Sequence, residues 1–446
     1  MNWNLRTHGR AWILASAILL ILWGFTSATA VGRSLKGSSD FDTFYEAGRA
    51  VLDRTGTIYY AGEYYKMREG VGPFLYPPIA ACFFAIFAWM LISWAAFLWN
   101  TALLILFFSS LLLTLRFLGI SWKEFPQIWK SVSVFDRLLF IAISFIILLD
   151  NLVMAQMGIP ILFLCLFSLV LWKDGKNFTA GLVLSCAILL KLTPIFFCLY
   201  FLLKRAWKLL AGVLVGGLLL SVVIPTLVFG WGGNRIYHRQ WFGRMIKPML
   251  IDVLAGGKKE EAHPLKKSYE EMQNIRQTQL LIDTNQSLPA ALTRLFLKDR
   301  HLYQVTYRYQ RLPVIGGGFS RGMVAAMILA VQIVLLLVLI FLLWARKVGE
   351  KVRIPLEVSL IFLSTILLSP IARSHSFIVW VFVFAALFFL QSKALLQKPV
   401  LTHSIRWACF LYLLLAIPYG EAVGMGAWAN LVLWIGCARA LAGLSR

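Results

Sequence analysis

The sequence predicts an all-α, polytopic integral membrane protein that forms a single domain over residues 1–446. Hydrophobic residues make up 60% of the chain and the mean hydropathy is +0.76, whereas soluble proteins are usually nearer 45–50% apolar. Several apolar runs reach the roughly 20 residues that cross a bilayer core. The net charge of +23 fits basic cytoplasmic loops. We therefore expect membrane lipids as partners and no nucleic acid.

The apolar runs predict about twelve transmembrane helices and two large outer loops, residues 32–74 and about 231–321. Basic residues before the first span predict cytoplasmic N- and C-termini in the cell (inner) membrane. We interpret this first span as an uncleaved anchor rather than a signal peptide. The expected spans are 11–31, 76–93, 95–115, 134–150, 155–172, 178–203, 207–229, 322–345, 354–371, 375–391, 404–418 and 422–441.

Two short loops do not fit this count. Residues 116–133 and 173–177 are basic but fall on the outer side, whereas the loop around residues 393–406 falls on the cytoplasmic side. If residues 178–203 formed a hairpin of two half-spans, the side of everything after them would invert. We keep twelve spans, with the topology of residues 116–133 and 173–203 left open.

Several kinds of site are not expected. All six cysteines lie in apolar stretches and none forms a Cys-x-x-Cys pair, so we expect no disulfide and no zinc site. The chain contains no P-loop and no dinucleotide-binding glycine pattern, which leaves no visible site for a soluble nucleotide-activated donor. We expect no cofactor. Two nearby carboxylates, Asp40 and Asp42, leave a divalent metal possible.

The first outer loop contains a short amphipathic helix that begins near Asp40. Its apolar residues recur at helical spacing and its charged residues fall on the other face, so we expect it to lie on the membrane surface. Asp40 stands at the N-cap position and is our candidate general base, the alternative being a simple cap. We expect the solvated face to carry Asp42, Glu46, Arg49 and Asp53.

Lys191 lies inside an apolar run that ends at Pro194. A charge at the centre of a span costs roughly 2.5–3.5 kcal/mol on insertion scales, so something must compensate it. An acidic partner, snorkelling or an anionic ligand such as a lipid phosphate would serve. Pro194 frees the carbonyl of Leu190 from helical hydrogen bonding, which predicts a local break in the helix.

Three further polar groups lie between apolar runs. Arg373 and His375 connect two spans on the expected outer side and could bind a phosphate, or form an ordinary loop. The cluster of Asp150, Asn151 and Gln156 is most simply a turn. We interpret the segment of residues 285–287, although it matches a glycosylation pattern, as a cap for the helix that follows it.

Together these places resemble glycosyltransferase family 87, multi-span enzymes of the GT-C fold that use polyprenyl-phosphate sugars. The resemblance is carried, in the family's order, by four segments with Ser369-Pro370 and His375 behind them. The chain departs from it where Ala155-Gln156-Met157-Gly158 keeps only the Gln of the family's Gly-Gln-x-Asn pattern. The four segments are Asp40-Phe41 through Arg49, Tyr76-Pro77-Pro78, Gly181 to Pro194, and Asn285-Gln286-Ser287-Leu288.

The resemblance implies an inverting enzyme that moves a hexose, typically mannose, from a polyprenyl-phosphate sugar to an acceptor hydroxyl of a glycan or glycolipid. Asp40 would be the catalytic base at the outer face. The candidate substrate contacts are Lys191, Arg373, His375, Arg49, Asp42 and Gln156. Two other functions stay open, namely a lipid or solute transporter or flippase, and a non-catalytic subunit of cell-envelope polysaccharide assembly.

Overall fold

The computed structural model describes residues 5–54, 58–59, 74–243, 284–298, 318–344, 350–393 and 399–443. Helices dominate these residues, and their β-pairing is limited to one isolated bridge between Leu297 and Phe319. The predicted all-α class is thus confirmed. The charged middle of the second outer loop (residues 258–271), and Tyr60, Tyr64 and Tyr65 in the first, lie outside the described residues.

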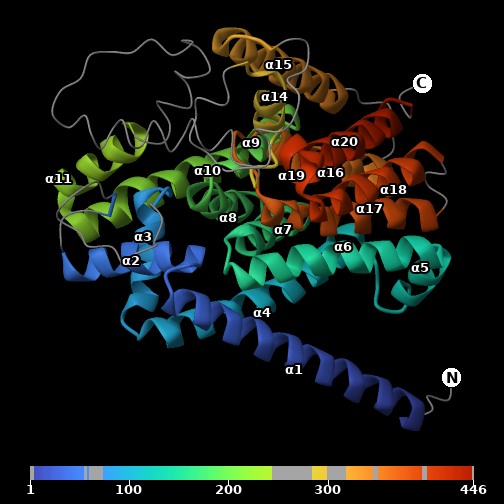
Figure 1. Ribbon diagram of the computed structural model, residues 1–446, viewed down its shortest axis with the longest axis horizontal. Coiled ribbons are helices and arrows are strands. Elements are labelled where there is room, and N and C mark those ends of the chain that lie inside the picture. The colour runs from blue at the N-terminus through green and yellow to red at the C-terminus, as the bar shows by residue number, and fades with distance from the viewer. Residues whose placement is uncertain are drawn as a thin grey trace.

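The chain forms a bundle in which α5 and both termini lie toward one end of the long axis and α2, α3 and α11 toward the other (Figure 1). The first half consists of α1 Leu5–Leu35, α2 Asp40–Asp53, α3 Pro78–Ala88, α4 Ile92–Leu118, α5 Phe125–Ser131, α6 Val134–Val153, α7 Gly158–Lys173, α8 Asn177–Leu190, η1 Thr193–Ile195, α9 Phe196–Leu203, α10 Trp207–Leu218, η2 Leu219–Val223 and α11 Ile224–Trp241. The second half consists of α14 Leu288–Phe296, α15 Arg321–Trp344, α16 Glu350–Leu367, η7 Ser374–Val379, α17 Trp380–Ser392, α18 Pro399–Leu413, η8 Leu414–Ala416, α19 Pro418–Val423 and α20 Met425–Ala442.

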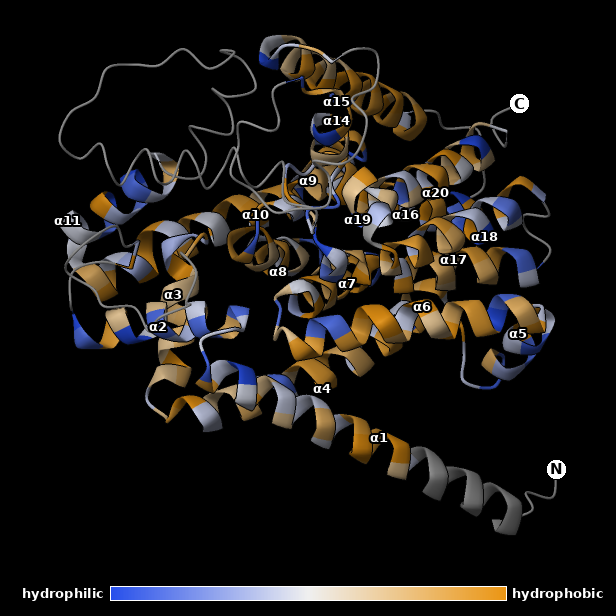
Figure 2. Cartoon of the chain, in the orientation of Figure 1, coloured by the Kyte–Doolittle hydropathy of each residue, from blue (hydrophilic) through white to orange (hydrophobic). Residues whose placement is uncertain are grey.

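The outer surface of the bundle is suited to lipid. Large apolar side chains point outward from α1, α4 and α15, where Ile21, Ile105 and Phe341 are 71%, 61% and 72% exposed. Figure 2 shows α15 coloured mostly as hydrophobic. Soluble proteins rarely expose apolar patches of this extent. The molecule is therefore a multi-pass membrane protein.

Not every apolar run is a full span. In the described part of the chain, seven helices are long and apolar enough to cross a bilayer, or eight if the bent pair of α5 and α6 counts as one. The run expected at 76–93 forms only α3, whose 11 residues rise about 16 Å, about half of the hydrocarbon thickness. Helix α3 packs closely on α2. A Cβ at Gly48 of α2 would lie 2.6 Å from the backbone of Phe84 in α3, so only glycine allows this approach.

The run expected at 178–203 is broken at Lys191. Helix α8 ends at Leu190, Lys191 is extended (φ −159°, ψ 129°), and η1 and α9 follow. The Lys191 end of α8 lies near Gly158, at the start of α7, whereas Phe201 of α9 contacts Trp172, at the end of α7. The segment thus turns back on itself as a pair of half-length helices, which is the hairpin alternative.

Ion pairs then show which loops share one end of the bundle. Lys393 Nζ lies 2.8 Å from Glu124 Oε1, and Lys173 Nζ donates to Phe117 O at 2.6 Å. The expectation that loops 116–133 and 173–177 lie opposite the loop around 393–406 is therefore wrong. Hydropathy cannot distinguish a short helix or a hairpin from a full span, and each such error inverts the side of the loops that follow.

We name the two ends by their residues. The basic end carries the ion-paired cations Arg116, Lys204, Arg353, Lys393 and Arg406. The site end carries the candidate site residues Asp40, Gln156, Lys191, Arg373 and His375. Between the two ends, α16, α17 and α20 form the most deeply buried part of the bundle.

Candidate active site

The start of α2 sets the position of Asp40. Ser39, and not Asp40, is the N-cap residue, and Asp42 closes the capping box by accepting from Ser39 N and Ser39 Oγ, both at 2.9 Å. A carboxylate at the third helical position suits this reciprocal arrangement. The prediction that Asp40 caps the helix is therefore wrong. The Asp40 carboxylate does not cap the helix and instead accepts a hydrogen bond from Gln156 Nε2.

Asp40 is partly buried among cations. Burial raises the pKa of its carboxyl above the ordinary value. The positive charges of Arg373, Lys191 and Arg33 act in the opposite direction. A carboxylate with a raised pKa is a stronger base than an ordinary aspartate, and nearby cations keep it ionised. Asp40 thus has the surroundings that a general base requires.

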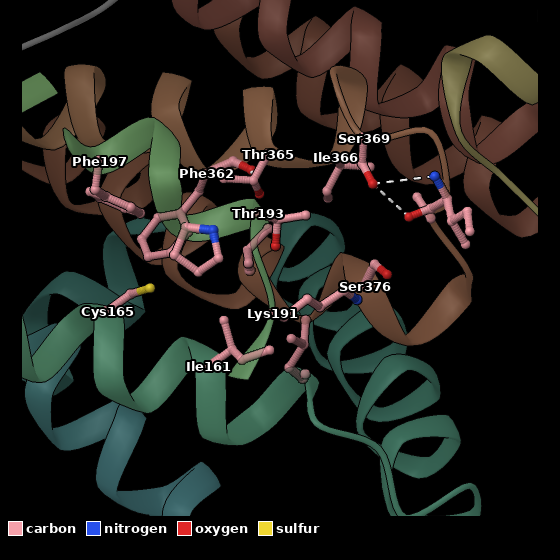
Figure 3. A pocket seen from close by; sticks show the side chains of 16 residues that line it. Ile161, Cys165, Lys191, Thr193, Phe197, Phe362, Thr365, Ile366, Ser369 and Ser376 are labelled. Carbon is pink, nitrogen blue, oxygen red and sulfur yellow. Dashed lines mark hydrogen bonds between the residues drawn. The ribbon is translucent and has the colours of Figure 1, made fainter. Parts of the chain in front are cut away.

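Lys191 lies at the break between α8 and η1 and lines a pocket together with residues of α7, α16 and η7 (Figure 3). Its ammonium group makes no hydrogen bond or ion pair within the part of the chain that the structure describes. Hydroxyls and apolar groups share the pocket wall. The other residues that line this pocket include Thr193, Thr365, Ser369, Ser376, Ile161, Cys165, Phe197, Phe362, Ile366 and Val379.

The segment after α16 carries Arg373 and His375, as expected. Ser374 Oγ donates to Asp150 Oδ2 at 2.8 Å, and Asn151 Nδ2 donates to the carbonyl of His375 at 3.0 Å. His375 Nδ1 lies 4.0 Å from Asp150 Oδ2. The end of α6 therefore holds this segment in place from one side.

The interpretation of Asp150 and Asn151 as a turn is wrong, because both lie in the last turn of α6. Asp150 lies beside the candidate site residue His375, which the sequence pattern did not predict. Its position between two apolar runs, beside Gln156, was the available signal. Gly158 permits the arrangement, since a Cβ there would lie 2.6 Å from Asn151 Oδ1 and 3.0 Å from the carbonyl of His375.

Two expected substrate contacts lie apart from this group. Asp42 is fully buried in the capping box, so its assignment to a solvated face is wrong. The reason is local, because a capping-box carboxylate turns back onto the N-cap backbone. Arg49 lies on the exposed face of α2, with its Nε 3.6 Å from Asp53 Oδ2 in a surface pair. The contacts of neither residue support a role in substrate binding.

The remaining residues form one arrangement. A partly buried carboxylate, hydrogen-bonded by an amide, lies near two cations, and one of these, Lys191, lines a largely apolar pocket. Such a site can take a proton from a hydroxyl and can stabilise an anion that forms or departs beside it. Among the residues that the structure describes, no three His, Cys, Asp or Glu side chains are grouped as metal ligands would be.

Comparison with known proteins agrees with this chemistry. The family model of glycosyltransferase family 87 matches residues 74–370. Two polyprenol-phosphate-mannose-dependent α-(1-2)-phosphatidylinositol mannoside mannosyltransferases, from Mycolicibacterium smegmatis and Mycobacterium tuberculosis, are each 30% identical to the chain. The matched segments cover 37% of this chain, and 38% and 40% of those relatives. No solved structure matches the chain. The family match extends over most of the sequence, and the chain therefore belongs to glycosyltransferase family 87.

Proposed function

We propose that the protein transfers a hexose, mannose by preference, from a polyprenyl-phosphate sugar to a hydroxyl of a glycan or glycolipid acceptor. The observation that carries this proposal is the placement of Asp40 near Lys191 and Arg373, two cations without ion-pair partners in the described residues. Of these, Lys191 lines a largely apolar pocket. A lipid phosphate carries both an anionic group for the two cations and an apolar chain for the pocket. The names of the two mannosyltransferase relatives support mannose and a glycolipid acceptor.

The reaction follows from the position of the base. Asp40 takes the proton of the acceptor hydroxyl, and the acceptor oxygen attacks the anomeric carbon of the donor sugar. The bond between that carbon and the phosphate oxygen breaks on the opposite face, so the configuration inverts. The electron pair of that bond goes to the phosphate, which leaves on the polyprenyl chain. The proton ends on the Asp40 carboxyl.

The cations act on the leaving group. The donor phosphate carries one negative charge, and it gains a second as the sugar departs. Lys191 and Arg373 stabilise that growing charge, and in a site with little water this contribution is large. His375 lies beside Asp150, with its Nδ1 4.0 Å from Asp150 Oδ2. The apolar side chains of the pocket, such as Phe197 and Phe362, contact the first isoprene units.

The orientation follows from charge. Cytoplasmic loops collect Lys and Arg, and the basic end of this bundle brings residues of the loops 116–133 and 173–177 together with Lys393 and Arg406. We assign this end and both termini to the cytoplasm and the site end to the outer face of the cell membrane. The donor would then reach the site from the outer half of the bilayer.

The test uses the full chain purified and reconstituted in vesicles. Polyprenyl phosphate carrying radiolabelled mannose is the donor, and phosphatidylinositol mannosides and alkyl mannosides are the acceptor probes. We expect a radiolabelled product with inverted anomeric configuration, together with released polyprenyl phosphate. Donor consumption without a glycoside, or a product of retained configuration, would contradict the proposal.

A transporter of lipid-linked sugars is the second candidate. The observation that favours it is the break between α8 and α9 with Lys191 at its turn, because broken helices with a charge at membrane depth are common in transporters. The same vesicles separate the two functions. Movement of the labelled lipid between leaflets without any covalent product would support transport.

A further inference from the structure

The chain segment before α14 binds the loop that leads to Arg373. Asn285 Nδ2 donates to Pro370 O at 3.1 Å, and Ala372 N donates to Asn285 Oδ1, also at 3.1 Å. The neighbouring residues add two bonds, from Gln286 N to Ala372 O at 2.5 Å and from Ser287 Oγ to Pro370 O at 2.9 Å. The loop is thus held by four hydrogen bonds from residues 285–287.

This segment is itself fixed from behind by the fully buried Arg294. Arg294 donates from Nε to Ala422 O at 2.7 Å and from a terminal nitrogen to Asn285 O at 2.8 Å. Gln286 Nε2 donates to Glu421 O at 3.0 Å, and Gly426 N donates to Gln286 Oε1 at 3.1 Å. The support therefore reaches from the loop to the start of α20.

We propose that Asn285 is a positioning residue that holds the Pro370–Ala372 loop so that Arg373 faces the Asp40 site. Arg373 follows the clamped residues directly. Its own backbone bonds to Ser376, whose Oγ accepts from Arg373 N at 3.4 Å and whose N donates to Arg373 O at 2.8 Å. The position of its guanidinium group therefore depends on the residues before it. This inference rests on the proposed role of Arg373 at the leaving phosphate.

The residue type is the one this contact requires. The Asn285 side chain uses its amide nitrogen as a donor and its oxygen as an acceptor for Ala372 N and for Ser287 N at 3.1 Å. An ionised aspartate of the same shape cannot donate and would place a negative charge beside the Pro370 carbonyl. Asn285 is also 0% exposed, which does not suit a glycosylation acceptor and fits the structural interpretation of this motif.

Asn285→Asp is the variant that breaks the clamp with least change in shape. Asn430→Asp is its matched control, because Asn430 is also fully buried, donates to Leu363 O at 2.9 Å and accepts from Trp380 Nε1 at 2.8 Å. Neither of these contacts involves the Pro370–Ala372 loop. Thermal unfolding of both variants shows how much of any effect is general destabilisation.

Hydrogen exchange of the loop is the first measurement and needs no substrate. We expect the peptide covering residues 369–376 to exchange about tenfold faster in Asn285→Asp, equal to about 1.4 kcal/mol. In Asn430→Asp the same peptide should exchange as in the wild type. Equal exchange in the wild type and Asn285→Asp would overturn the clamp, whatever reaction the protein catalyses.

A double-mutant cycle is the second measurement. If Asn285 acts through Arg373, Asn285→Asp should lower kcat about tenfold in the wild type and by less than about twofold in Arg373→Gln. The same fold loss in both backgrounds would overturn the link to Arg373. A wild-type protein that transfers no sugar would instead refute the proposed function, and hydrogen exchange would still decide the clamp.

Discussion

The two ends of the bundle use positive charge in different ways. At the basic end, Glu357 Oε1 accepts from Arg353 Nε at 2.5 Å and Glu357 Oε2 lies 2.7 Å from Lys204 Nζ. Arg116, Lys393 and Arg406 each have a carboxylate oxygen within 2.8 Å. At the site end, neither Lys191 nor Arg373 has such a partner among the residues that the structure describes.

Paired and unpaired cations have different roles in this bundle. Removing a cation from water is costly, so a cation inside a membrane protein is normally paired or marks a pathway or ligand site. The paired cations of the basic end join helices, as Glu357 of α16 joins α9. The unpaired cations of the site end, Lys191 and Arg373, lie near one partly buried carboxylate, and Lys191 also lines a pocket. We infer that a substrate anion supplies the missing partner.

Asp40→Asn should have the largest effect on activity. It removes the proposed base but keeps the shape and the contact with Gln156, so we expect sugar transfer to fall about 10³-fold. The assay is radiolabelled transfer in reconstituted vesicles. Asp53→Asn, at the exposed end of α2, is the control and should stay within about twofold of the wild type. Full activity of Asp40→Asn would remove Asp40 from the role of base.

Neutralising a cation should lower kcat at the site end of the bundle but not at the basic end. Arg373→Gln and Lys191→Gln should each lower kcat about 10²-fold, because each removes charge stabilisation from the leaving phosphate. Arg116→Gln removes an exposed cation that is paired with Asp174 at the basic end and should leave kcat unchanged. If Arg373→Gln and Lys191→Gln kept the wild-type kcat, as Arg116→Gln should, the unpaired cations would have no part in the reaction.

The pH dependence of transfer reports on the same site. Asp40 must be ionised to act as a base, and burial raises the pKa of its carboxyl, so kcat/KM should rise with pH through that raised value. Arg373 lowers this pKa. In Arg373→Gln the acid limb of the pH profile should therefore shift to higher pH. An acid limb that does not move would mean that the titrating group is not Asp40.

Stability should respond to Asp40 in the opposite sense to activity. A carboxyl whose folded-state pKa is raised stabilises the fold below its unfolded-state value, and this contribution is lost as the pH rises through the folded-state pKa. At neutral pH the ionised Asp40 therefore opposes folding, and Asp40→Asn should raise Tm. Thermal unfolding in detergent measures this. A lower Tm for Asp40→Asn than for the wild type would contradict the direction of the pKa shift.

Glu357→Gln should have the smallest effect on the chemistry and a large one on stability. It leaves Arg353 and Lys204 without their carboxylate, and breaking a buried pair costs about 3 kcal/mol or more. We expect a lower Tm with kcat close to the wild-type value. The exposed pair of Glu124 and Lys393 is the comparison, and Glu124→Gln should leave Tm unchanged. A selective loss of kcat in Glu357→Gln would break the distinction between the two ends.

Part of the site was predictable because it depends on neighbours in the sequence. The pattern of the first outer loop predicted that a helix begins near Asp40. Pro194 after Lys191 predicted a helix break, which lies between α8 and η1. Arg373 and His375 stood between two apolar runs. The N-cap was misplaced by one residue, because Ser39 and Asp40 are both good capping residues and only the direction of the Asp42 side chain decides between them.

The sequence by itself determined what depends on local composition, namely an all-α membrane protein with a candidate base at Asp40, a broken helix at Lys191 and a cationic segment near Arg373. The tertiary structure decided which distant groups meet. It brought Gln156 to Asp40, Asp150 to Ser374, and Asn285 to the loop before Arg373. It also decided which runs are full spans. Hydropathy reports whether a segment prefers lipid, whereas packing between helices far apart in the chain sets the depth and the partners of each segment.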